Sequence, residues 1–280
     1  MSRWATWLVV GALAAVGVAA AVDALREGGG RPRPEAVRST TAPLLARQPE
    51  LAVRRLREAG VTGLLTFSDE GCRLHSLSLP ELTAEPAPSY EMCRPLSAAG
   101  GLGAVDGDVV WSGLGYGTVQ VVVTREALGR GVNRALGQAA AAEGAGFRAV
   151  QAVAIGDGRT VVLAESTYRP TERVLALLEG GRVRAVQPRW VVGDARFLRA
   201  SPRGTFFAVF GPGGVRLFDR DAAPLGLPEG VADPHAVAWS PDERWTALAA
   251  GESVVLFPSE PPHVPVVNVP LAVRDLDWSG

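Results

Sequence analysis

The side chains that most often carry chemistry are few and scattered in this sequence. The three histidines, His75, His235 and His263, show no metal-ligand spacing, so each is expected on a strand or at the surface. The acidic residues lack the close alternation of a calcium loop. No Gly-x-Ser-x-Gly elbow is present, and the Gly-rich stretch 113–118 lacks the Lys of a phosphate-binding loop. We therefore assign no catalytic residue, no metal ligand and no cofactor.

The two cysteines, Cys72 and Cys93, are the remaining candidates, and they lie in one short region. An even cysteine count in a chain with an export signal is typical of a disulfide. Their spacing excludes a C-x-x-C redox pair, and a zinc site would need further ligands. We predict a Cys72–Cys93 disulfide, with two buried free thiols as the alternative.

The export signal is an uncharged segment at residues 4–22, with tryptophans at one end. Its length is close to the roughly 20 residues that cross a bilayer as a helix. We predict a transmembrane signal anchor at 1–25, a flexible stalk rich in Gly, Pro and Arg at 26–48, and an extracytoplasmic domain at 49–280. Long domains behind an N-terminal anchor are translocated largely regardless of nearby charge. The alternative is a cleaved signal peptide and a secreted protein.

Composition narrows the classes of partner. The formal net charge of -1 argues against nucleic acid, whose binding proteins usually carry a basic surplus. All 28 basic side chains are arginine. Because Ala, Gly and Val are abundant too, we interpret the arginine usage as compositional rather than as a sign of phosphate binding.

The elements that would position any site are short strands. From Val61 onward, apolar runs alternate with Gly, Pro and Asp, which indicates strands joined by turns. Similar units begin near residues 101, 149, 195 and 235, an interval of roughly 40 to 50 residues that suits four-stranded propeller blades. Two short segments differ: a helix is expected at 49–60, between a Pro and a Gly, and a helical or irregular insertion at 133–146.

The two best copies of the repeat share a Ser-Pro turn, at Ser201-Pro202 and Ser240-Pro241. Proline pre-sets a turn dihedral, and an Asp two residues after the Ser can bond backbone amides.

The segment Trp239, Ser240, Pro241 and Asp242 resembles the Trp-Ser-Pro-Asp repeat of bacterial WD40-like, TolB-type β-propellers. The usual glycine after the Asp is Glu243 here. The resemblance implies a fold and no particular activity.

The two ends of the domain complement each other. The last residues, 272–280, read as the first strand of a blade, because Trp278-Ser279 repeats Trp239-Ser240. Residues 60–82 read as the second and third strands, with Cys72 on the third, and 88–97, with Cys93, as the fourth. A propeller needs such closure to avoid unpaired edges. We predict an all-β propeller of about five four-stranded blades, closed by the N- and C-terminal strands and preceded by one N-terminal transmembrane helix.

Three functions compete. The first is a non-enzymatic, membrane-anchored, extracytoplasmic scaffold that binds a protein or ligand, with an envelope protein or glycan as its partner. The second is a propeller-fold hydrolase or lyase, which would need acids or histidines clustered at one mouth of the ring. The third is a structural subunit or sensor portion of an envelope complex. The absence of a catalytic pattern favours the first.

Overall fold

The protein is known from a computed structural model that describes residues 48–86, 102–106, 109–113, 120–137, 146–169, 171–192 and 194–280. All of these lie in one compact unit, Thr40–Gly280. The predicted anchor and nearly all of the predicted stalk fall outside the described residues. Within the described part of the chain, no helix has the length and hydrophobicity needed to cross a membrane.

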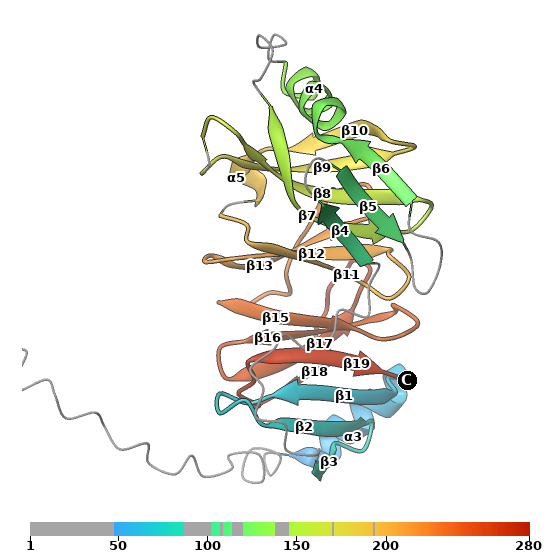
Figure 1. The fold of residues 1–280 in the computed structure, drawn as a ribbon. Coiled ribbons are helices and arrows are strands. Elements are labelled where there is room, and N and C mark those ends of the chain that lie inside the picture. The colour runs from blue at the N-terminus through green and yellow to red at the C-terminus, as the bar shows by residue number, and fades with distance from the viewer. Residues whose placement is uncertain are drawn as a thin grey trace, which may run out of the picture. The chain divides into compact units, whose positions relative to one another are not determined.

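The apolar runs form short strands, and the strands form five antiparallel sheets in the described residues (Figure 1). The first sheet has the spatial order β19 (Asp275–Ser279), β1 (Gly63–Ser68), β2 (Leu74–Leu79) and β3 (Thr83–Pro86). The second has β4 (Leu102–Asp106), β5 (Val109–Gly113) and β6 (Gln120–Thr124). Each sheet is built from neighbouring stretches of chain, apart from β19.

The other three sheets follow in chain order. The third has the order β10 (Arg182–Gln187), β9 (Arg173–Glu179), β8 (Arg159–Ser166) and β7 (Phe147–Ile155). The fourth contains β11 (Phe197–Ala200), β12 (Phe206–Gly211), β13 (Gly214–Asp219) and β14 (Pro224–Leu225). The fifth contains β15 (Pro234–Trp239), β16 (Trp245–Ala250), β17 (Ser253–Pro258) and β18 (Val267–Val269). Four of the five sheets have four antiparallel strands, which is consistent with a β-propeller.

The first sheet confirms the predicted pairing of the chain ends. Strand β19 lies antiparallel to β1, with Trp278 opposite Leu65 and Leu276 opposite Phe67. One detail of the prediction is wrong: β3 is the fourth strand, whereas residues 88–97, predicted for that place, lie outside the described residues. The cis peptide bond between Leu79 and Pro80 lies in the short connection from β2 to β3. Because β3 begins at Thr83, the fourth strand comes earlier in the chain than the sequence pattern suggested.

The core consists of layers between successive sheets, because strands bury side chains on both faces. Successive side chains of a strand point to opposite faces. On β12, Phe206, Ala208 and Phe210 pack toward the fifth sheet, and Phe207 and Val209 pack toward the third. Such strands are apolar at nearly every position. Their sequences therefore show continuous apolar runs rather than an alternation of apolar and polar residues.

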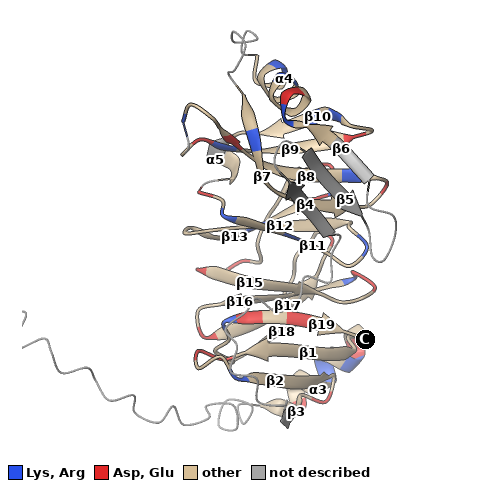
Figure 2. Cartoon of the chain, viewed as in Figure 1, with Lys and Arg blue, Asp and Glu red and all other residues tan. Residues whose placement is uncertain are grey.

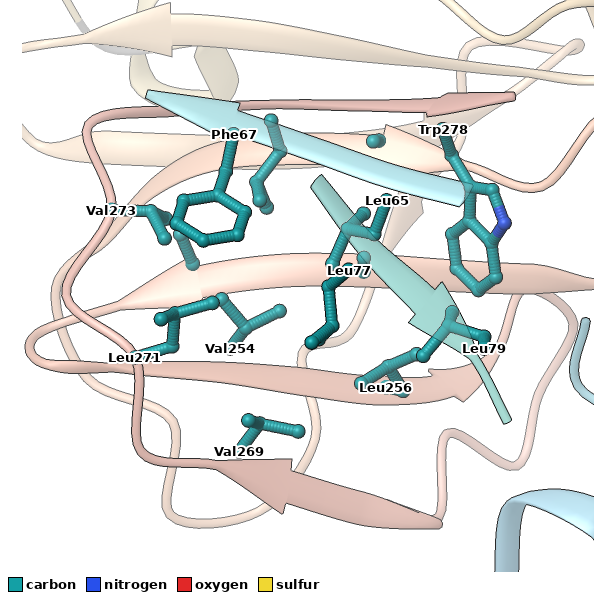
Figure 3. Packing of buried hydrophobic residues seen from close by; sticks show 14 of the residues in the cluster. Leu65, Phe67, Leu77, Leu79, Val254, Leu256, Val269, Leu271, Val273 and Trp278 are labelled. Atoms are coloured by element: carbon teal, nitrogen blue, oxygen red, sulfur yellow. The ribbon is translucent and has the colours of Figure 1, made fainter. Parts of the chain in front are cut away.

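The layer between the first and fifth sheets holds Trp278, which is among the largest fully buried side chains of the described residues (Figure 3). Its indole Nε1 donates a hydrogen bond to the carbonyl oxygen of Thr62 over 3.2 Å. Helix α3 (Pro49–Ala59) also buries Leu56 in this layer. The helix ends where Gly60 takes a left-handed φ of 70°, so both predicted limits of this helix are confirmed.

The second sheet has three strands in the described residues, where four were predicted. Strand β6 leads directly into helix α4 (Arg125–Ala135), and the Thr124 hydroxyl caps this helix by accepting from the amide of Ala127. Leu128 and Val132 of α4 are buried against the third sheet. The sequence placed a helical or irregular segment at 133–146, so the helix begins earlier than expected. A short helix, α5 (Arg189–Val192), precedes β11.

Candidate functional site

The predicted Ser-Pro turns are structural, and Asp242 is engaged within its own turn. The Ser240 hydroxyl donates to Asp242 Oδ1 over 2.6 Å and accepts from the amide of Trp245. The bond from Ser240, helped by Arg244 and only partly opposed by burial, holds the pKa of Asp242 below its usual range. The turn satisfies its own polar groups, as such turns commonly do. Pro241 is exposed beside them.

The sister turn has the same construction. The Ser201 hydroxyl accepts from the amide of Phe206 over 3.0 Å, and Pro202 follows it. Gly204 has a φ of 74°, and the equivalent Glu243 has a φ of 61°. The departure from the usual glycine therefore leaves the turn conformation unchanged. Glu243 also accepts the backbone N–H of Arg203 through Oε1, which joins the two turns across adjacent sheets.

The other predicted positions are core residues or turn residues. Trp239 is buried between the fourth and fifth sheets, and Trp278 between the first and fifth. Cys72 lies in the β1–β2 turn, so its predicted place on the third strand of the blade is wrong. It is buried there, 3.5 Å from the guanidinium of Arg274. Cys93 lies outside the described residues, so the disulfide stays a prediction.

The histidines are spread over separate places. His75 packs against Phe67 and lies 3.0 Å from Asp69 Oδ2. Burial opposes ionisation of Asp69, but bonds from the Arg73 amide and His75 outweigh it and lower the pKa of Asp69. The Nδ1 atom of His263 lies 3.0 Å from the carbonyl oxygen of Pro258. Among the described residues, no three His, Cys, Asp or Glu side chains are grouped to hold a metal ion.

A hollow between the fourth and fifth sheets is the best candidate for a binding site. Its volume is about 400 Å³, within the usual range for ligand sites. The start of β11, the β12–β13 turn at 211–214 and the start of β15 enclose it. Phe197 lines it and is 40% exposed, although large aromatic side chains are usually buried. We call this feature the Phe197 hollow.

A pair of stacked aromatic rings forms the floor of the Phe197 hollow. Phe197 lies directly opposite Phe210 across the strand pair, and their rings stack with centroids 4.1 Å apart. The guanidinium carbon of Arg199 lies 5.5 Å from the centroid of the Phe210 ring, within cation–π range. The exposed ring is thus supported by a second aromatic ring and a cation. The rim is polar, with Arg196, Asp233 and His235.

Arg199 is itself buried, and it joins three sheets. It is only 6% exposed. Its Nη1 donates to the carbonyls of Val237 on β15 and Leu276 on β19, both over 2.9 Å. Its Nη2 lies 3.1 Å from both carboxylate oxygens of Asp275. A buried cation needs both a counter-charge and acceptors for its donors, and this arginine has both.

Further hydrogen bonds join the first strands of neighbouring sheets on either side of Arg199. On β7, the Gln151 amide donates to the carbonyl of Leu198 and accepts its N–H, over 3.1 and 2.7 Å. His235 Nε2 lies 2.7 Å from the carbonyl of Val273, just before β19. Burial raises the pKa of Asp277, although Arg199 and the Trp278 amide oppose this effect. Of the acids on β19, red in Figure 2, Asp275 is the one that forms an ion pair with Arg199.

Sequence reasoning missed Phe197 and Arg199. Both belong to the short run 197–200, which reads as one more apolar strand interrupted by a charge. The available signal was that charge, because an Arg inside a strand with apolar residues on both sides must find a partner when the strand is buried. The identity of the partner depends on contacts between distant sheets.

Comparisons with known proteins leave the function open. No family model matches the chain, and no curated protein matches it. Among solved structures, hydrazine synthase of Kuenenia stuttgartiensis is 12% identical, with 78% of this chain and 74% of that chain covered and a TM-score of 0.36. AztD of Citrobacter koseri is 10% identical, with 74% and 55% covered and a TM-score of 0.36. The Cps50 (Swd1) β-propeller domain of Myceliophteria thermophila is 10% identical, with 77% and 73% covered and the same TM-score.

Proposed function

We propose that the chain is a membrane-anchored, extracytoplasmic β-propeller of the TolB-like type, and that it serves as a scaffold that binds a protein of the cell envelope. The observation that carries this proposal is the exposed Phe197 ring in a hollow of about 400 Å³. The partner would place an apolar side chain against this ring and polar groups on the rim.

The chemistry of the hollow suits a protein partner. Interface energy is concentrated in a few aromatic and arginine anchors surrounded by polar contacts that exclude water. Phe197 is such an anchor, and Arg196 and Asp233 lie beside it on the rim. The stacked Phe210 ring fixes the orientation of Phe197 before binding, so little side-chain freedom is lost on association.

The experiment is site-directed photo-crosslinking in cells that produce the full chain. A photoreactive phenylalanine analogue is placed at Phe197 in one strain and at Tyr168, which is also exposed, in another. We expect one discrete protein adduct from position 197 and none of the same mass from position 168. With the purified adduct partner, Phe197→Ser should weaken binding at least about tenfold, since each tenfold is about 1.4 kcal/mol and anchors exceed that. Identical adducts from both positions, or unchanged affinity of Phe197→Ser, would overturn the proposal.

The cellular location belongs to the same proposal and has its own test. Alkaline phosphatase fused behind Gly280 folds only outside the cytoplasm, so we expect an active fusion in the membrane fraction. Thiol labelling of the denatured, unreduced chain should leave Cys72 and Cys93 unmodified, and labelling after reduction should modify both. An inactive fusion together with freely labelled thiols would place the domain in the cytoplasm.

A further inference from the structure

Four arginines converge on a groove between helix α4 and the β9–β10 hairpin. Its volume is about 480 Å³. Arg130 and Arg134 line it from the helix, and Arg182 and Arg184 line it from β10. Helix α4 lies against β10 in the fold (Figure 1). We call this feature the arginine groove.

The four arginines come in two pairs, one pair from helix α4 and one from strand β10. Residues four apart on a helix lie on one face, with Cβ atoms about 5–6 Å apart. Residues two apart on a strand also share a face, at about 6.5–7 Å. Arg130 and Arg134 obey the first rule. On β10 the pairing register shifts between Val183 and Ala185, so the strand does not alternate regularly there, and Arg182 and Arg184 both line the groove together with Val183. Two arginines from the helix and two from the strand therefore line the groove.

The floor of the groove is made by small residues that let the helix approach the strand. Ala127, Gly131 and Ala135 lie four residues apart on α4 and all line the groove. A Cβ added to Gly131 would lie 2.8 Å from the Cβ of Val183, closer than side chains tolerate. The close approach keeps the floor narrow, so the long arginine side chains form the walls.

The groove carries a surplus of positive charge. Arg130 pairs with Glu126, and Arg184 pairs with Glu179 over 2.7 Å. No carboxylate of the described part of the chain forms an ion pair with Arg134 or Arg182. Figure 2 shows basic positions on both α4 and β10. Like charges placed this close repel one another, and a bound anion would remove that repulsion.

We propose that the arginine groove binds a phosphate-bearing anion. Guanidinium presents a planar fork of N–H donors that fits phosphate oxygens in pairs, and two such forks can hold one phosphate group from opposite sides. The volume suits a small ligand or a single headgroup. The near-zero net charge of the chain and the small size of the groove disfavour a nucleic-acid track. The proposal concerns a different surface from the Phe197 hollow, and either can fail without the other.

The test is isothermal titration of the full chain with pyrophosphate at low ionic strength, together with co-sedimentation on phosphatidylglycerol vesicles. Binding of pyrophosphate identifies a soluble phosphate ligand. Neutral phosphatidylcholine vesicles give the baseline due to the predicted anchor at 1–25, so binding of phosphatidylglycerol vesicles above that baseline, without binding of pyrophosphate, identifies an anionic lipid phosphate. In either arm, Arg134→Gln/Arg182→Gln should weaken binding at least about tenfold, because hydrogen bonds to charged groups are the strong ones. These side chains are exposed, so thermal unfolding of the double variant should match that of the wild type.

The matched control removes the same charge elsewhere. Arg169→Gln/Arg220→Gln changes two exposed arginines outside the groove, whose side chains are 80% and 52% exposed. This control should bind like the wild type. The proposal is overturned if pyrophosphate does not bind and phosphatidylglycerol vesicles bind no better than phosphatidylcholine vesicles, or if both double variants weaken binding equally. It is also overturned if citrate binds as tightly as pyrophosphate, because the site would then recognise negative charge alone.

Discussion

Replacement of Arg199 by methionine tests whether the buried contacts among the fourth, fifth and first sheets hold the domain together. Methionine keeps most of the length and apolar volume of the side chain but removes its charge and all its donors. Val237 and Leu276 would each lose a donor to their carbonyls, and Asp275 would lose its bidentate partner. Packing changes little, so the measured effect reports the polar contacts.

The expected loss is about 4 kcal/mol in the free energy of unfolding. Breaking a buried ion pair by removing one partner costs about 3–5 kcal/mol, because a charge remains buried without compensation. Exposed pairs contribute about 0–1 kcal/mol. The Arg199 and Asp275 side chains are 7% and 14% exposed, so the first figure applies. Against a typical total of about 5–15 kcal/mol, this is a large fraction.

The assay is guanidinium unfolding of the full chain at neutral pH, followed by tryptophan fluorescence. Arg220→Met is the control, because its pair with Asp157 is 52% and 63% exposed, and it should change stability by less than about 1 kcal/mol. Arg199→Met/Asp275→Leu should recover part of the loss, since an apolar pair of similar volume can replace a buried ion pair. A loss below about 1 kcal/mol for Arg199→Met, or no recovery in the double variant, would refute the reasoning.

Three further predictions concern the turns, the closing strand and pH. Gly204 has a left-handed φ, and a Cβ added there would lie 2.6 Å from the backbone of Ile155. Gly204→Ala should therefore raise the unfolded fraction sharply in thermal melts. Gly213→Ala should not, because open space surrounds that position. Trp278→Ala should cost about 3–5 kcal/mol in denaturant titrations. Because burial raises the folded-state pKa of Asp277, the free energy of unfolding contains a component that declines as pH rises from about 4 toward neutrality. Asp277→Asn removes this component. In urea titrations, the free energy of unfolding of the variant minus that of the wild type should therefore increase from acid to neutral pH. A difference that stays constant with pH would contradict this.

The sequence was sufficient to predict the pairing of the chain ends and the sheet repeat. Trp278-Ser279 repeats Trp239-Ser240, and a first strand without a second must find its partner elsewhere. Pairing of β19 with β1 follows from that local signal and the need to cover a sheet edge. The second sheet was less predictable, because a Thr that ends one strand can equally cap a helix, as Thr124 does.

Neither candidate site was predictable in the same way. Each depends on residues that only the packing of distant elements brings together. Arg134 and Arg182 belong to different elements, and in a chain whose basic residues are all arginine their composition carries no signal. Phe197 looks like any core aromatic in the sequence, and only its position at the start of β11 leaves it exposed.

The two Ser-Pro turns show why a repeat can drift in sequence while its geometry stays fixed. Gly204 takes a left-handed φ at no steric cost, whereas Glu243 pays a penalty of order 1 kcal/mol for nearly the same conformation. The Glu243 carboxylate, which accepts the amide of Arg203, supplies a charged hydrogen bond that offsets this penalty. That bond joins neighbouring sheets at the end where Gly156 also donates to the carbonyl of Gly204. The mismatch to the repeat pattern at Glu243 thus coincides with a contact between the fourth and fifth sheets.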